Sequence, residues 1–248
     1  VLLPFAVSRI KQINKKNITS LILVGFMGSL LPALFFALAQ TKLPSALTGI
    51  MNALTPFFTI IISVLFFNVK PDKRVYFGVT LGFLGTLFLI STRENGQLSF
   101  NYYAFFVVAA TVLYGINANL IKHYLGGLKS LSIASLSLIM VGPLAVIYLF
   151  LFTPFLDHIH EPKVLMASGY IVILGVLGTA LALILFNKMV QLTNAVFSTS
   201  VTYVIPIISV FWGFIDGEKL SLIQLASMLT IMLGIFISNS KKVIKKLG

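Results

Sequence analysis

The chain has 248 residues, of which 58% are hydrophobic and only 10% are charged, and its mean hydropathy is +1.02. Because so few polar residues cannot cover the surface of a soluble globular protein, we expect an integral membrane protein. The absence of cysteine excludes a disulfide framework, a thiolate metal site and an iron–sulfur cluster, and the net charge of +12 has to be explained by where the basic residues lie.

Apolar runs of helix length follow one another along the chain, without the strict alternation of a transmembrane barrel strand. The first ten residues, VLLPFAVSRI, are too short to cross a bilayer and are expected to be the end of a span. Eight complete spans are predicted, at residues 20–40, 45–67, 75–91, 100–121, 131–152, 166–187, 195–215 and 222–238. The predicted fold class is an all-α polytopic membrane protein.

The chain also contains two copies of one pattern, separated by 150 residues: Gly25 matches Gly175, and Pro56 matches Pro206. A long repeat made of membrane helices is typical of transporters built from two halves. The second copy begins near residue 100, which places the start of the first copy about fifty residues before Val1. We therefore expect a first repeat at residues 1–95, lacking its first helix and most of its second, and a second repeat at 96–248. Ten helices, five per repeat, are expected for the complete protein, with about eight and a half present here.

Basic residues predict the orientation. If the chain ends in the cytoplasm, fourteen of the 18 Lys and Arg residues lie inside, and only Lys42, Arg93, Lys163 and Lys219 lie outside. This bias predicts a multi-pass protein of the bacterial inner membrane with a cytoplasmic C-terminus, and makes the two repeats inverted. The basic tail at 241–246 is expected to contact anionic lipid; a nucleic-acid patch is the weaker alternative, and we expect no nucleic-acid partner.

Ionisable side chains are missing from the middle of the predicted spans. No Asp, Glu, Arg or His lies well inside one, and Lys188 is near a span end, where it can reach the interface. We therefore expect no catalytic residue, no cofactor and no metal site, and we interpret the His158 and His160 pair as solvated. Transport down the solute's own gradient is favoured, with proton antiport as the alternative.

Neutral polar side chains do lie inside the spans, and they are the candidate lining of a solute cavity: Asn52, Tyr114, Asn117, Asn119, Ser200, Thr202 and Tyr203. Tyr114 and Asn117 can share one helix face, whereas Asn117 and Asn119 are about 200° apart. The alternative for each is a bond between helices, worth about 0.6 kcal/mol.

Prolines and glycines mark special backbone positions. Pro56 and Pro206 each remove a helical hydrogen bond, and paired breaks point to a transport site, with a tolerated kink as the alternative. The glycines are interpreted as packing seams, and Trp212 as a residue of the interfacial aromatic belt.

The segment from Gly175 to Ser238, with its central Pro206, its Gly217-Glu218 turn and its glycine-bearing last helix, resembles the second domain of EamA-type members of the drug/metabolite transporter superfamily. VLYGINANLIK, at 112–122, is similar to the opening helix of that domain. The resemblance implies ten helices, cytoplasmic termini and a central cavity for export of amino acids, other metabolites or toxic compounds. We expect an inner-membrane exporter of small organic solutes that works by alternating access. A non-transporting scaffold or accessory subunit is the alternative, and a homodimer remains open.

Overall fold

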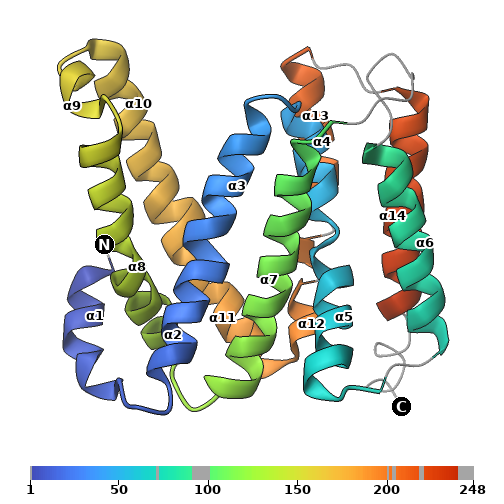
Figure 1. Cartoon of the computed structure of the whole chain (residues 1–248), viewed down its shortest axis with the longest axis horizontal. Coiled ribbons are helices and arrows are strands. Elements are labelled where there is room, and N and C mark those ends of the chain that lie inside the picture. Colours follow the sequence, from blue (N-terminus) through green and yellow to red (C-terminus); the bar gives the residue numbers. More distant parts are fainter. Residues whose placement is uncertain are drawn as a thin grey trace. The chain divides into compact units, whose positions relative to one another are not determined.

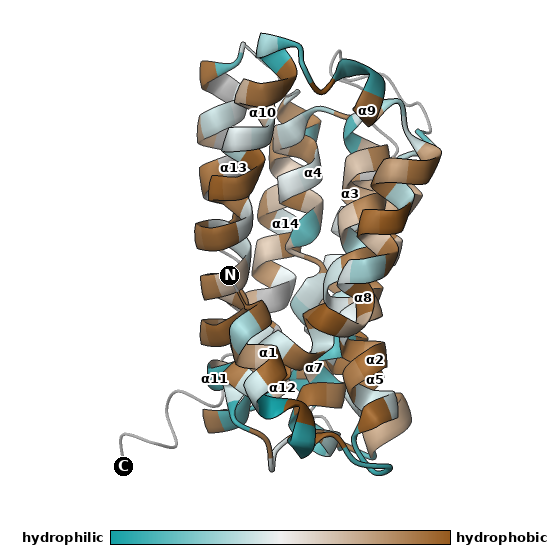
Figure 2. Ribbon diagram, turned by 90° about the vertical axis from the view of Figure 1, so that its left-hand side faces the viewer, coloured by the Kyte–Doolittle hydropathy of each residue, from teal (hydrophilic) through white to brown (hydrophobic). Residues whose placement is uncertain are grey.

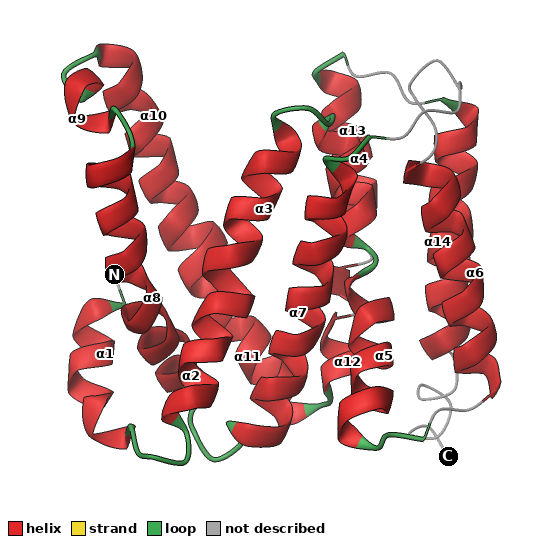
Figure 3. Ribbon diagram, in the orientation of Figure 1, coloured by secondary structure: helices red, strands yellow, loops and turns green. Residues whose placement is uncertain are grey.

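The computed structural model describes residues 2–70, 73–90, 101–199, 201–202, 205–217 and 221–239, and in these ranges every regular element is a helix (Figure 3). Five helices of the described chain are long and apolar enough to cross a membrane: Ile18–Gln40, Ser45–Phe67, Ala104–Tyr124, Ser130–Phe152 and Pro162–Leu192. Figure 2 shows hydrophobic residues along the helices and hydrophilic residues at their ends. The all-α prediction is confirmed, and these helices coincide with five of the eight predicted spans.

The chain divides into two compact units. Unit 1 is Val1–Leu30 and Leu120–Asn194. It contains α1 (Leu3–Arg9), the 3-10 helix η1 (Ile10–Gln12), α2 (Ile18–Gly25), the π-helix η2 (Phe26–Leu30), α8 (Ser130–Phe152), α9 (Phe155–His158), α10 (Pro162–Ile173), the π-helix η3 (Leu174–Leu181) and α11 (Ala182–Leu192). Helices α1, α2 and α11 all pack against α8.

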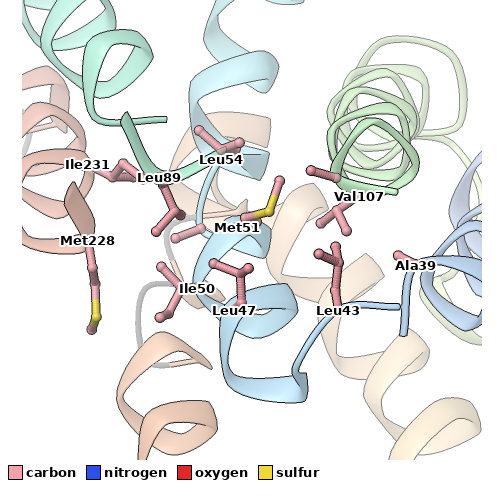
Figure 4. Packing of buried hydrophobic residues seen from close by; sticks show 12 residues of the cluster. Ala39, Leu43, Leu47, Ile50, Met51, Leu54, Leu89, Val107, Met228 and Ile231 are labelled. Carbon is pink, nitrogen blue, oxygen red and sulfur yellow. The ribbon is translucent and has the colours of Figure 1, made fainter. Parts of the chain in front are cut away.

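Unit 2 is Leu31–Asn119 and Ala195–Gly248. It contains α3 (Leu31–Gln40), α4 (Ser45–Asn52), α5 (Thr55–Phe67), α6 (Lys73–Ile90), most of α7 (Ala104–Tyr124), α12 (Ala195–Thr199), α13 (Ile205–Ile215) and α14 (Leu222–Asn239). Its core is a cluster of buried side chains around Met51, Leu54 and Val107 (Figure 4). Helices α6 and α14 run side by side (Figure 1), α13 packs against α4, and α12 packs against α5.

These contacts agree with the 150-residue offset. Under that offset α4 corresponds to α12 and α5 corresponds to α13, so the α4–α13 and α5–α12 contacts are two versions of one contact. The π-helices also lie at matching positions, because η2 shifted by 150 residues falls inside η3. Each unit draws helices from both predicted repeats. The predicted boundary near residue 95 lies outside the described residues, and the repeat boundaries remain a prediction.

The break between α4 and α5 has a local cause. Pro56, the second residue of α5, has no N–H to donate to the carbonyl of Asn52 four residues earlier. The hydroxyl of Thr55 takes over and donates to Asn52 O at 2.9 Å, while Ala53 N and Leu54 N make tight i to i−3 bonds. The helix therefore ends at Asn52 and restarts at Thr55. Helix α13 likewise begins at Ile205, directly before Pro206.

Glycines bring backbones into direct contact in both units. In unit 1, a Cβ added to Gly25 of α2 would lie 2.5 Å from Ser137 O of α8. In unit 2, a Cβ on Gly234 of α14 would lie 2.5 Å from Gly78 O and from Gly82 N of α6. Such distances leave no room for a side chain. Gly25, Gly78 and Gly82 therefore have the packing role that the sequence predicts for them. The same prediction is wrong for Gly175, because a Cβ added there would meet nothing within 4 Å.

The Gly234 contact predicts a stability effect. We expect Gly234→Ala to destabilise the protein by about 1–3 kcal/mol, because its methyl group must push α6 and α14 apart. Gly142→Ala is the matched control: Gly142 also lies within a helix, but an added Cβ meets nothing within 4 Å. Thermal unfolding in detergent measures both variants. Equal midpoints for Gly234→Ala and Gly142→Ala would contradict this account of the α6–α14 contact.

Candidate functional site

Unit 2 contains a cavity of about 360 Å³ between α3, α4 and α13. Small-molecule sites commonly have volumes of about 300–1,000 Å³, so the space suits a metabolite-sized solute. The lining residues are Phe36, Gln40, Ser45, Thr48, Gly49, Asn52, Ile205, Ile208 and Trp212. None of these described lining residues carries a charge.

The polar wall of the cavity is one face of α4. Its residues follow one another at helical spacing: Thr48, Gly49 and Asn52 come three, four and seven residues after Ser45, which places all four on one side of the helix. Gly49 adds no side chain and keeps the wall open between its neighbours. Thr48 Oγ1 donates to Pro44 O at 3.0 Å, so its oxygen can still accept a hydrogen bond from a solute.

Asn52 closes the deep end of this polar wall, at the helix break. Its Oδ1 accepts a hydrogen bond from Thr55 Oγ1 at 3.2 Å, and this bond orients the amide. Its Nδ2 makes no hydrogen bond within the described chain, so it can donate to a solute. The break that Pro56 imposes thus places a free amide donor beside the cavity.

The facing walls are apolar and aromatic. Phe36 and Gln40 are one turn apart on α3, and Ile205, Ile208 and Trp212 follow one face of α13. Neutral donors and acceptors on one side and aromatic rings on the other suit an amphipathic solute without net charge. A net charge would have to be desolvated there without an opposite charge on the lining.

Tyr114 and Asn117, both predicted from the sequence, are not among the lining residues of this cavity. The ring of Tyr114 stacks on Phe36 with centroids 6.0 Å apart and planes at 27°, so Tyr114 supports a wall of the cavity. Asn117, one turn further along α7, is 4% exposed, and its Oδ1 has no hydrogen-bond partner among the described residues. A buried amide oxygen without a partner costs about 1–3 kcal/mol, and a solute donor or a water would remove that cost.

The other predicted residues have different surroundings. Asn119 is fully buried: its Oδ1 accepts from Ser63 Oγ at 2.7 Å, and its Nδ2 donates to Thr59 O at 3.1 Å and Gly115 O at 3.0 Å. The bonds to Ser63 and Thr59 join α7 to α5, the bond to Gly115 lies within α7, and together they account for the burial of Asn119 without a solute. Thr202 Oγ1 donates to Thr199 O at 2.7 Å. Ser200 and Tyr203 lie outside the described residues, as does the side chain of Pro206.

Several lining residues were missed by sequence reasoning, which selected Asn52 on α4 and assigned Trp212 to the aromatic belt. Gln40, Ser45, Thr48 and Gly49 line the cavity as well. The signal was available in the spacing of Ser45, Thr48 and Asn52, which is a polar stripe on an otherwise apolar helix. The contribution of Trp212 depends on the packing of α13 against α4, which no local pattern reveals.

Comparisons with known proteins agree with this architecture. The family model described as the EamA-like transporter family matches residues 1–91 and 101–240. An uncharacterized transporter of Archaeoglobus fulgidus is 24% identical over 234 residues, which cover 94% of this chain and 81% of that protein. A protein of known crystal structure superposes with a TM-score of 0.58 at 16% identity, covering 97% of this chain and 83% of its own, and shows a similar fold.

The bonds of Asn119 predict a loss of stability. We expect Asn119→Leu to destabilise the protein by about 1–3 kcal/mol, because it removes the buried hydrogen bonds to Ser63 Oγ, Thr59 O and Gly115 O. The control is Thr230→Val, which removes an exposed hydrogen bond within α14 to Ala226 O. Unfolding midpoints in detergent measure the difference. A midpoint for Asn119→Leu equal to that of Thr230→Val would rule out the role in joining the helices.

Proposed function

Because the chain belongs to the EamA-like transporter family, we propose that it is an inner-membrane secondary transporter that exports small amphipathic organic solutes, such as amino acids, by alternating access between two inverted repeats. The observation that carries this proposal is the neutral cavity of unit 2, with the polar face of α4 on one side and Phe36 and Trp212 on the other. A scaffold without a transport role would be expected to fill that space with leucine and phenylalanine.

Solute binding would use the groups that the cavity leaves unpaired. Asn52 Nδ2 offers donors, the Thr48 oxygen accepts, and the aromatic rings of Phe36 and Trp212 cover the apolar part of the solute. Asn117 Oδ1 is a further acceptor beyond the Phe36–Tyr114 stack. A solute that moves from the α4 face toward Asn117 would exchange one set of neutral hydrogen-bonding groups for another.

Access to two sides would come from the broken helices. The pairs α4–α5 and α12–α13 correspond under the 150-residue offset; the first pair is interrupted before Pro56, and α13 begins directly before Pro206. A broken helix can tilt one half while the other stays packed. Two such helices in inverted copies would give alternative arrangements of similar stability, one open to each face of the membrane.

The cavity predicts a transport phenotype. In proteoliposomes of the full-length protein, with a solute identified by a metabolite screen, we expect Asn52→Leu and Asn117→Leu each to lower kcat/KM for transport about tenfold, which corresponds to about 1.4 kcal/mol. Each variant loses a neutral hydrogen-bonding group where water is scarce. Thr230→Val is again the control, and expression and unfolding midpoints should match those of wild type. Unchanged transport by both leucine variants would show that the solute does not pass through this cavity.

The energetics of transport give a second prediction. Because the lining residues of the cavity are neutral, we expect solute flux to follow the solute gradient. In proteoliposomes with a solute gradient and no pH gradient, flux should persist, and a protonophore should change it little. Accumulation of solute against its gradient when a pH difference is imposed would instead establish proton antiport.

A further inference from the structure

Within unit 1, the C-terminal end of α7 and the C-terminal end of α11 cap each other. Lys122, in the last turn of α7, donates from Nζ to Gln191 O at 3.2 Å and to Thr193 O at 2.6 Å, at the end of α11. Gln191, in the last turn of α11, donates from Nε2 to Leu125 O at 3.3 Å and to Leu128 O at 2.5 Å, directly after α7. We call these four bonds the latch.

Helix ends explain the strength of the latch. The last carbonyls of a helix have no partner within the helix and carry a partial negative charge, so an ammonium group binds them favourably. Hydrogen bonds from a charged donor are about twice as strong as neutral ones. All four bonds are partly buried, which shields them from competition by water.

The latch holds the turn that precedes a broken helix. Helix α11 ends at Leu192, only Thr193 and Asn194 follow, and α12 begins at Ala195. The chain passes between the two units near both latch residues. One boundary, between Asn119 and Leu120, lies close to Lys122 in the sequence, and another, between Asn194 and Ala195, lies close to Gln191. Only Asn194 separates α12 from the residue whose carbonyl Lys122 holds.

The opposite end of α7 contacts the corresponding turn of the first copy. Asn101, just before α7, donates from Nδ2 to Lys42 O at 3.3 Å, in the turn between α3 and α4. Under the 150-residue offset that turn corresponds to the turn between α11 and α12. The bond from Asn101 to the first turn is long, neutral and exposed, whereas the second turn is held by a charged donor in a reciprocal pair.

We propose that Lys122 is a positioning residue for the transport cycle: its latch keeps the α11–α12 turn in place, and release of the latch is the step that lets α12 and α13 change position. The Asn101 bond is the weaker counterpart at the other end of α7 and releases more easily. The inference rests on the proposed transport function, but the latch itself can be tested without any solute.

The test uses the absence of cysteine from these 248 residues. Ala195→Cys places a thiol at the first residue of α12, where the side chain is 4% exposed, and Ala104→Cys places a reference thiol at the first residue of α7, at 2% exposed. Each is introduced singly into the full-length protein, with any upstream cysteine replaced. The rate of modification by a polyethylene-glycol maleimide is read as a gel shift in detergent. Lys122→Met and Gln191→Leu weaken the latch, Lys122→Arg keeps the cation, and exposed Lys188→Met is the matched charge control.

We expect Lys122→Met and Gln191→Leu to raise the labelling rate at Ala195→Cys about tenfold, a factor that corresponds to about 1.4 kcal/mol. Labelling at Ala104→Cys should not change, and Lys122→Arg and Lys188→Met should behave as wild type. If Lys122→Met does not fold, Gln191→Leu decides the question. Equal acceleration at both thiols would show general loosening, and no acceleration in either variant would show that the latch does not hold the turn; both results overturn the inference. If the latch variants label faster as expected but a metabolite screen finds no transported solute, the latch stands and the proposed transport function fails.

Discussion

The cavity depends on one missing hydrogen-bond donor. Pro56 has no N–H, so α4 cannot run on into α5, and the carbonyl of Asn52 is taken by the hydroxyl of Thr55. In a membrane such a rearrangement is necessary, because a backbone carbonyl without a partner costs several kcal/mol when no water is near. The single hydroxyl proton of Thr55 is shared between Asn52 O, at 2.9 Å, and Asn52 Oδ1, at 3.2 Å, which leaves the amide Nδ2 as a donor beside the cavity. The break and the site are therefore one local structure, and this is why a neutral asparagine can be exposed to solute at the end of an apolar helix.

Unit 2 contains two kinds of helix contact: close backbone contacts at glycines, and contacts made by the segments beside the helix breaks. Helices α6 and α14 touch through the backbone at Gly78, Gly82 and Gly234, and such contacts do not slide without steric clashes. The α4–α13 and α5–α12 contacts involve the segments beside the breaks, where fewer helical hydrogen bonds resist a change. Each unit contains helices from both predicted repeats, so movement within a unit would involve both halves of the sequence.

Sequence reasoning reached the helical class, the five long spans and the family, because hydrophobic length and the repeat are properties of the chain itself. It also pointed to the interruption between α4 and α5, since proline acts on its own backbone, whereas several residues before Pro206 lie outside the described chain. It did less well with the site. Asn117 and Asn119 look alike in the sequence, yet one has an unpaired oxygen and the other bonds to Ser63, Thr59 and Gly115, and the difference lies in which helix each side chain meets. Trp212 and Gln40 became lining residues only through the packing of α13 and α3 around α4.

Trp212 offers the most direct test that this cavity binds the transported solute, because it lines the cavity and is the single tryptophan in these 248 residues. Its fluorescence in the purified protein can be titrated with a solute that the protein transports, with any tryptophan outside these residues replaced by phenylalanine and with Trp212→Phe as the blank. The account predicts a saturable change in emission, with a midpoint near the KM for transport, that shifts to higher concentration in Asn52→Leu and does not shift in Thr230→Val. A transported solute that leaves the emission of Trp212 unchanged at saturating concentration would contradict the assignment of this cavity as the binding site.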